Sequence, residues 1–297
     1  MSIQHNHHNH VIDSDWGLIF AIGINTLLTF VQVIGGIISG SLSLIADALH
    51  NLSDAASLGI AFFARTLGRK PADEFKTFGY QRAEVVAALI NLTLLITVSL
   101  YLIYEALWRI VEPQTITGLI MVLIAGIALI IDMITAFITF KMSKDSINMK
   151  AAFLHNLSDA LASVGVIIAG SLIFLYEWYW VDTLVTFLIA GFILWQALVL
   201  VPKTIHLLME GSPEGLSSED IQHSAEEING VKEVHHIHVW SIDEHRIAME
   251  AHVVVTTNKL KEVEVIKVEL KQLLKKQFNI THSTLEFEHH IDSNCDE

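Results

Sequence analysis

Six long apolar segments restrict the folds that this chain can adopt. They cover residues 16–38, 42–64, 83–108, 116–140, 150–174 and 180–201. Each is close to the ~20 apolar residues that a helix needs to cross a bilayer. The whole chain has only 17% charged residues, against about 25% in soluble domains. The pattern therefore predicts an α-helical membrane protein with six transmembrane helices in residues 16–205, preceded by a His-rich cytoplasmic tail at 1–15.

Basic residues predict how these helices are oriented. Lysine and arginine are concentrated in the connectors after the second and fourth segments, at residues 65–82 and 141–150. By the positive-inside rule these connectors lie in the cytoplasm, and both termini then lie there too. No cationic region precedes the first apolar segment, so we predict a retained span rather than a cleaved signal peptide. The expected location is the cytoplasmic (inner) cell membrane, with several passes through the lipid.

After Pro202 the chain becomes polar, and residues 206–297 are predicted to form a cytoplasmic α+β domain. The patterns predict a helix from Ser217 to about Asn229, strands at 234–242 and 247–255, a helix at 259–278 and a strand at 284–288. This αββαβ order is typical of helices that cover one face of a sheet. The single cysteine, Cys295, excludes an intrachain disulfide or a Cys-based metal site. The formal net charge is −14, and no nucleic-acid partner is expected.

The string Leu-His-Asn-Leu-Ser-Asp-Ala occurs twice, at 49–55 in the second apolar segment and at 154–160 in the fifth. Each copy places an imidazole and a carboxylate about one helical turn apart on one face, as His50 with Asp54 and His155 with Asp159. The predicted topology makes the two helices antiparallel, so that both aspartates fall near the middle of the bilayer. Two nitrogens and two carboxylate oxygens suit a tetrahedral divalent cation, zinc above all.

These four residues have three other interpretations. Polar groups inside a membrane sometimes only form hydrogen bonds between helices. An intramembrane metalloenzyme would use the same ligands, but catalytic zinc normally keeps one position for water, and here four protein groups fill the tetrahedron. A membrane-anchored metal sensor would signal through the C-terminal domain, which leaves the buried pairs without a role. Because the ligands must release protons to bind metal, exchange of a cation for protons fits them best.

Two further carboxylates lie inside the apolar segments. Asp47, one turn before His50, is predicted either to orient an imidazole and line a polar route or to hydrogen-bond between helices. Asp132 is predicted to line a cavity or relay protons, with helix packing as the alternative. The histidines within residues 5–10 form either a weak metal-capturing tail or a dispensable one.

Several motifs make the chain resemble the cation diffusion facilitator family over nearly its whole length. They are the six apolar segments, the two HxxxD motifs, Phe78-Gly79-Tyr80-Gln81-Arg82-Ala83-Glu84 before the third segment and Leu208-Met209-Glu210-Gly211-Ser212-Pro213 after the sixth. The αββαβ order that follows also fits. Within the family the chain looks most like the bacterial zinc exporters, which share the His-Asp/His-Asp set with vesicular zinc transporters of animals.

The resemblance implies a homodimer that exports zinc from the cytoplasm in exchange for protons by alternating access, and so confers zinc tolerance. It carries the transport site over to four residues: His50, Asp54, His155 and Asp159. It also implies a ferredoxin-like cytoplasmic domain that contributes to the dimer and binds zinc as a regulatory ligand. The family's ligands in that domain fall on His235, His252 and Glu288. Members with Asp in place of the first His also accept cadmium, so His50 favours zinc, with cadmium or cobalt as further candidate cargo.

Two other family features concern the connectors. Arg82 and Glu210 stand where the family can form a charge pair between helices near the dimer interface. Some members bind a second zinc through an Asp and two His in the loop after the second helix. Here only Asp73 remains of that set, with Lys76 and Tyr80 at the histidine positions, so we predict that this loop site is absent.

Overall fold

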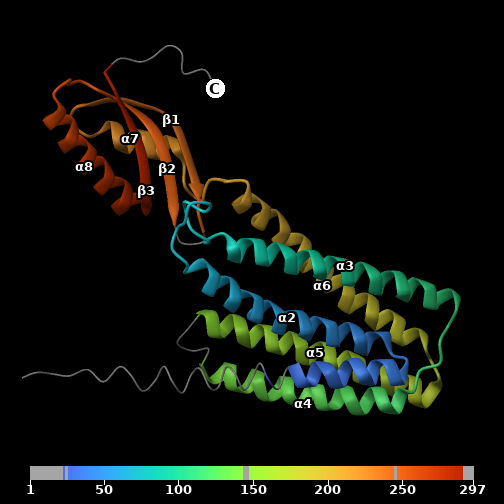
Figure 1. Cartoon of the computed structure of the whole chain (residues 1–297). Coiled ribbons are helices and arrows are strands. Elements are labelled where there is room, and N and C mark those ends of the chain that lie inside the picture. The colour runs from blue at the N-terminus through green and yellow to red at the C-terminus, as the bar shows by residue number, and fades with distance from the viewer. Residues whose placement is uncertain (1–22, 24–25, 143–146, 244–245, 290–297) are drawn as a thin grey trace, which may run out of the picture. The chain divides into compact units, whose positions relative to one another are not determined.

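The computed structural model of the chain describes residues 23, 26–142, 147–243 and 246–289. The chain forms two compact units. One contains Met1–Ile60 and Ile90–Leu200, and the other contains Ala61–Leu89 and Val201–Glu297. Long helices make up the described part of the first unit, whereas the second unit contains a small sheet with two helices of its own (Figure 1).

The long helices follow the predicted apolar segments. A helix at Thr26–Ser39 comes first. It is followed by α2 (Leu42–Gly68), α3 (Ala83–Val111), α4 (Gly118–Met142), α5 (Ile147–Tyr176) and α6 (Trp180–Leu208). Among the described residues, four helices are long and apolar enough to cross a membrane: Ala83–Val111, Gly118–Phe140, Phe153–Tyr176 and Trp180–Leu208. Helix α2 has a similar length, 27 residues, and carries both members of the first HxxxD motif.

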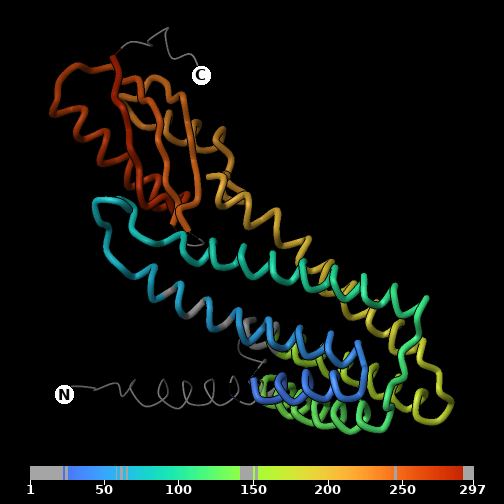
Figure 2. The backbone as a smooth tube through the Cα atoms, turned by 45° about the vertical axis from the view of Figure 1, so that its right-hand side comes forward, coloured from blue at the N-terminus to red at the C-terminus, as the bar shows by residue number. Residues whose placement is uncertain are grey.

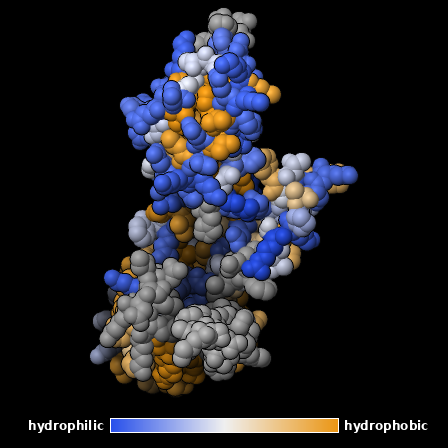
Figure 3. All heavy atoms as spheres, turned by 90° about the vertical axis from the view of Figure 1, so that its left-hand side faces the viewer, coloured by the Kyte–Doolittle hydropathy of each residue, from blue (hydrophilic) through white to orange (hydrophobic). Residues whose placement is uncertain are grey.

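Helices α4 and α5 lie side by side and pack closely (Figures 1 and 2). A Cβ atom added at Gly118 of α4 would stand 2.5 Å from the carbonyl oxygen of Gly170 on α5, so the two backbones approach too closely for any larger residue. Small residues allow this approach between helices in a membrane. Large apolar side chains such as Ile130, Phe137 and Ile168 are exposed instead. Figure 3 shows hydrophobic side chains on the outer surface of the helices, as expected of a surface that faces lipid.

Asp182, in the first turn of α6, fixes the N-terminus of α2. Its buried carboxylate accepts hydrogen bonds of 2.6–3.2 Å from two backbone N–H groups and two hydroxyls of residues 41–43. The N–H groups of a first helical turn have no partner within their helix, and a carboxylate there also faces the positive end of the helix dipole. Arg109 of α3 lies 3.9 Å from the same carboxylate and donates to the carbonyl oxygen of Gly40. The start of α2 is therefore held in place about 12 Å along the helix axis from His50.

The C-terminal residues form an αββαβ domain in the predicted order. Its elements are α7 (Ser218–Glu226), β1 (Val231–Ser241), β2 (Ile247–Val255), α8 (Leu260–Phe278) and β3 (Ile280–Glu288). Strand β2 lies in the middle, antiparallel to β1 and parallel to β3. Strand β3 is longer than predicted, because α8 ends at Asn279 in the left-handed conformation and extended backbone follows at once. The predicted fold class, a helical membrane protein with a C-terminal αββαβ domain, is confirmed.

One face of the sheet packs on α7 and α8 to form the core of this domain. Val234, Ala251 and Leu285 lie in that core or against it. Because side chains alternate along a strand, the residues next to them lie on the opposite face. These residues include His235, His252 and Glu286, and Glu288 lies on the same face two residues beyond Glu286. The sheet therefore presents its histidines and glutamates on the face away from the helices.

Candidate metal centre

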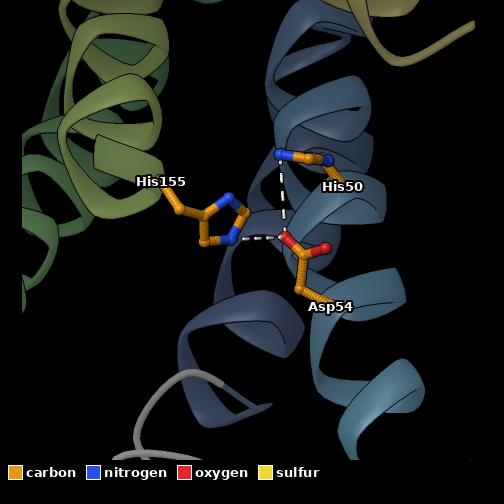
Figure 4. A group of neighbouring side chains, drawn as sticks. All are labelled: His50, Asp54 and His155. Atoms are coloured by element: carbon orange, nitrogen blue, oxygen red, sulfur yellow. Dashed lines mark ion pairs between the residues drawn. The ribbon is translucent and has the colours of Figure 1, made fainter. Parts of the chain in front are cut away.

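Helices α2 and α5 bring the two HxxxD motifs together. His50 and Asp54 project from α2 toward His155 of α5 (Figure 4). The imidazole Nε2 of His50 lies 3.6 Å from Asp54 Oδ2 and 3.4 Å from Asp159 Oδ1. The Nε2 of His155 lies 3.2 Å from Asp54 Oδ2 and 3.6 Å from Asp159 Oδ2. Each imidazole thus has a carboxylate of its own helix and one of the other helix beside it.

These separations suit one small ion. Ligand atoms about 2.05 Å from a tetrahedral zinc ion lie about 3.4 Å from one another. The four nitrogen–oxygen distances of the cluster, 3.2–3.6 Å, scatter around that value. In addition, Asp54 Oδ2, which lies beside both imidazoles, is buried and makes no hydrogen bond to any described group. One ligand atom each of His50, Asp54 and His155 lies within 4.8 Å of the others, and Asp159 turns one oxygen to each imidazole, so the donor set is compatible with a divalent cation.

The four side chains differ in exposure. Those of Asp54 and His155 are 36% and 46% exposed, whereas those of His50 and Asp159 are 12% and 9% exposed. Because α2 and α5 run antiparallel, the exposed pair and the buried pair lie at two different depths. Asp54 and His155 are the members nearer to the Lys/Arg-rich connectors that follow α2 and precede α5. The more exposed ligands are therefore the ones toward the C-terminal end of α2 and the N-terminal end of α5.

Asp47 lies beside this cluster and is held by a residue of the first helix. Its Oδ2 accepts a hydrogen bond of 2.6 Å from Gln32 Nε2, and Gln32 Oε1 accepts one of 3.2 Å from Asn51. The other carboxylate oxygen of Asp47 is buried and has no hydrogen bond among the described residues. Gln32 is not among the predicted site residues, although an amide inside an apolar segment is a sequence signal of a polar interior; the structure buries it fully. The role predicted for Asp47 stays a prediction.

Asp132 of α4 is buried and pairs with α5. Its Oδ2 accepts a hydrogen bond of 3.1 Å from the hydroxyl of Ser163, which lies about one turn beyond Asp159. Ser163 is fully buried and did not stand out in the sequence. The contact joins α4 to α5 about one turn from Asp159. Both predicted roles of Asp132, in a polar route or in packing, are compatible with this position.

A second group of ligand atoms lies on the exposed face of the sheet. His252 Nδ1 is 2.7 Å from Glu288 Oε1, and His235 Nε2 is 3.8 Å from Glu288 Oε2. One ligand atom from each of the three residues lies within 4.8 Å of the others. Both ring nitrogens of His235 are buried without a hydrogen bond to any described group. A metal ion would satisfy the nitrogen that faces Glu288, so this set fits the predicted regulatory zinc.

The connector between α2 and α3 is organised by Asp73. Its carboxylate accepts hydrogen bonds from the Tyr80 hydroxyl at 2.7 Å and from the backbone N–H groups of Phe75 and Lys76. These bonds, led by that of Tyr80, hold the pKa of Asp73 below its usual range, and the same contact raises the pKa of Tyr80. Asp73 therefore closes a turn of this connector. The predicted absence of a zinc site here stays a prediction.

The predicted charge pair between Arg82 and Glu210 lies within one chain. Arg82 Nη2 is 3.0 Å from Glu210 Oε1, and the glutamate is largely exposed. An exposed pair of this kind contributes on the order of 0–1 kcal/mol. The predicted N-terminal histidine tail lies outside the described residues.

Two family models together match nearly the whole chain. Residues 18–209 match the cation efflux transmembrane domain, and residues 213–290 match the cation efflux protein cytoplasmic domain. A solved structure described as the metal-bound C-terminal domain of the CzcD transporter from Cuprividus metallidurans is 34% identical over 25% of this chain and 99% of its own, with a TM-score of 0.23. That score is too low for a structural inference.

Curated relatives are similar over both parts of the chain. The metal cation efflux system protein CzcD of Cupriavidus metallidurans is 35% identical over 95% of this chain and 89% of its own. A protein of Bacillus subtilis named cadmium, cobalt and zinc/H(+)-K(+) antiporter is 38% identical over 87% of this chain and 84% of its own. The zinc transporter ZitB of Escherichia coli is 31% identical over 97% and 93%, respectively.

Proposed function

The chain belongs to the cation efflux family, whose members are membrane transporters and not enzymes, and we propose that it exports Zn²⁺ from the cytoplasm in exchange for protons. The observation that carries the proposal is the cluster of His50, Asp54, His155 and Asp159 on α2 and α5. Its four nitrogen–oxygen distances of 3.2–3.6 Å, with one oxygen of Asp159 facing each imidazole, are close to the spacing of ligand atoms around a tetrahedral zinc ion.

The ligand set supports zinc as the main cargo. Two imidazoles and two carboxylates suit zinc, whereas sites made only of oxygen ligands suit magnesium, calcium or manganese. Among the relatives, one is named as a zinc transporter and another as an antiporter of cadmium, cobalt and zinc. Cadmium and cobalt are therefore secondary candidates, and the imidazole of His50 is the ligand that favours zinc over cadmium.

The same ligands support coupling to protons. Imidazole and carboxylate groups bind a metal ion only in their deprotonated forms, so the arrival of Zn²⁺ and the departure of protons are linked. Histidine undergoes this change near neutral pH. A site that alternates between the two faces of the membrane would then carry Zn²⁺ in one direction and protons in the other.

Unequal exposure of the ligands supports a cytoplasm-facing state. By the positive-inside rule the connector after α2 and the connector before α5 lie in the cytoplasm, and both termini with them. The exposed ligands, Asp54 and His155, are those nearer to these connectors. The conformation described here would accordingly take up its cargo from the cytoplasm. We place the transporter in the cytoplasmic membrane.

Further parts of the proposal concern assembly and regulation. We propose that two chains form a homodimer, which the match to the cytoplasmic domain of cation efflux proteins supports. We propose that residues 1–15 form a cytoplasmic tail, 16–205 the transmembrane domain and 206–297 the cytoplasmic domain. In the last of these, His235, His252 and Glu288 would hold a regulatory zinc ion.

Zinc uptake by proteoliposomes under an imposed pH gradient tests the transport proposal. The wild type should accumulate zinc when the gradient is present and not when a protonophore collapses it. Asp159→Ala should abolish uptake, because the site loses one of its two carboxylates. Ser158→Ala is the matched control, since this exposed hydroxyl only donates to the backbone of its own helix. The proposal fails if Asp159→Ala takes up zinc as fast as Ser158→Ala. It also fails if zinc uptake by the wild type is the same with and without the pH gradient.

A further inference from the structure

An irregularity in β1 changes the direction of one histidine. In a regular strand, side chains alternate, so His236 would share the core face with Val234. The pairing of β1 with β2 shifts between His235 and His238, which inserts one extra residue into β1. His236 lies in this bulge with a φ of +50°, a conformation that residues other than glycine seldom adopt. The bulge turns His236 away from the core.

The bulge brings four imidazoles into a row. The ring centroids of His235 and His252 are 5.4 Å apart, those of His252 and His236 are 5.0 Å apart, and those of His236 and His238 are 4.7 Å apart. His236 and His238 are both exposed to solvent. Strained backbone that places a titratable side chain in a cluster is a reason to look for a function.

The outer two histidines have the spacing of metal ligands. The Nε2 atoms of His236 and His238 are 3.3 Å apart, which matches the ~3.4 Å edge of a tetrahedron of nitrogen ligands around zinc. The adjacent His252 directs Nδ1 to Glu288 at 2.7 Å and has its Nε2 3.7 Å from Glu286. His252 therefore has one ring nitrogen beside the His235–Glu288 set and the other beside a different carboxylate.

We propose that the bulge of β1 forms a second divalent-cation site in the cytoplasmic domain, with His236 and His238 as ligands through their Nε2 atoms. It takes metals that prefer imidazole, such as Zn²⁺, Co²⁺ or Ni²⁺, and water completes its coordination. It fills after the His235–His252–Glu288 set, because its two ligands are exposed and fewer. A hydrogen bond between the two rings has the same 3.3 Å spacing, and such a pair would bind no additional ion. The proposal does not depend on transport.

Metal counting on the purified full chain separates these alternatives. The background variant His50→Ala/Asp159→Ala disables the intramembrane cluster, and all variants keep the same N-terminal histidines. Zinc bound after equilibrium dialysis is measured per chain by mass spectrometry. Adding His236→Asn/His238→Asn should remove one bound zinc at high free zinc and leave the tighter zinc in place. Asparagine suits position 236 because it tolerates positive φ better than most residues.

Two controls assign the lost ion. His223→Asn replaces an exposed histidine of α7 whose described ion-pair partner is a carboxylate one turn away, and it should change nothing. His235→Asn/Glu288→Gln should remove the tighter zinc instead. Unchanged zinc binding in His236→Asn/His238→Asn overturns the proposal, as does loss of the tighter ion alone. If the metal-free double variant unfolds at a lower temperature than the background, His238→Asn alone provides the test, because it leaves the bulge residue intact.

A transport assay keeps this proposal apart from the proposed function. His236→Asn/His238→Asn in the otherwise natural chain should retain proton-driven zinc uptake in proteoliposomes while it loses one bound zinc. Failure of the wild type to transport would refute the proposed function and leave the metal count untouched. An unchanged metal count in an active transporter would refute only the second site.

Discussion

Replacing Asp182 by alanine should destabilise the helical part of the protein more than most single substitutions. The carboxylate is completely buried and accepts four hydrogen bonds from residues 41–43 at the start of α2. With alanine at position 182, the backbone N–H groups of Leu42 and Ser43, both buried, lose the acceptor that Asp182 provides. The substitution also removes the carboxylate next to the guanidinium of Arg109, whose other acidic neighbour is Glu105 at 3.4 Å.

The size of the effect follows from these contacts. Each buried N–H left without a partner costs about 1–3 kcal/mol, and removing one member of a buried charge pair costs about 3–5 kcal/mol in total. These two costs partly count the same lost contacts, so we expect the free energy of unfolding to fall by about 4 kcal/mol. For a chain of this size that corresponds to a fall in the unfolding midpoint on the order of 10 °C.

Thermal unfolding of the purified protein in detergent, followed by tryptophan fluorescence, measures this fall. Asp220→Ala is the matched control, because Asp220 is also a first-turn aspartate but is exposed on α7. Surface substitutions of this kind change stability by about 0.5 kcal/mol or less. If Asp182→Ala unfolds within 2–3 °C of Asp220→Ala, roughly the effect of 1 kcal/mol, the carboxylate does not anchor α2 and the argument is wrong.

Four further predictions concern the transport cluster, its surroundings and the topology. His50→Asp should lower the ratio of zinc to cadmium uptake in proteoliposomes, because an oxygen ligand replaces the more selective imidazole. Asp132→Asn keeps an acceptor for Ser163, so zinc affinity in equilibrium dialysis should stay within about twofold, while uptake driven by a pH gradient should fall; equal losses of both would assign the residue to packing. Arg82→Ala should shift the unfolding midpoint by less than about 3 °C, because an exposed pair is worth at most about 1 kcal/mol. A membrane-impermeant maleimide should label Cys295, the sole cysteine, in inverted vesicles and not in intact cells, whereas labelling in cells would place the C-terminus outside.

The features that could be predicted from the sequence depend on residues close together in the chain. A run of about 20 apolar residues forms a helix wherever it meets lipid, because no other local structure satisfies its backbone there. Two residues that are four apart lie on one face of any such helix. The sequence alone therefore predicts that His50 and Asp54 share a face, and that His155 and Asp159 do too. The positive-inside rule then predicts that the two helices are antiparallel. That orientation is what lets one cluster form from two copies of the same string.

The features that escaped prediction depend on contacts between distant residues or on a single backbone irregularity. Asp182 meets the start of α2 across about 140 residues of sequence, and nothing local to α6 says that its first-turn carboxylate belongs to another helix. Gln32 and Asp47 are only 15 residues apart in sequence, but they lie on two different helices, so their hydrogen bond also depends on how helices pack.

The histidines of β1 illustrate the second cause. Strict alternation puts His235 and His236 on opposite faces, and only the shifted pairing with β2 unites them. One extra residue in a strand reverses the direction of the side chains around it. A sequence pattern of period two cannot report that reversal, because the pattern itself assumes a regular strand. Clusters of ligand-type residues on strands therefore need a structure before their members can be assigned to one site, whereas on a regular helix the spacing alone places two residues on one face.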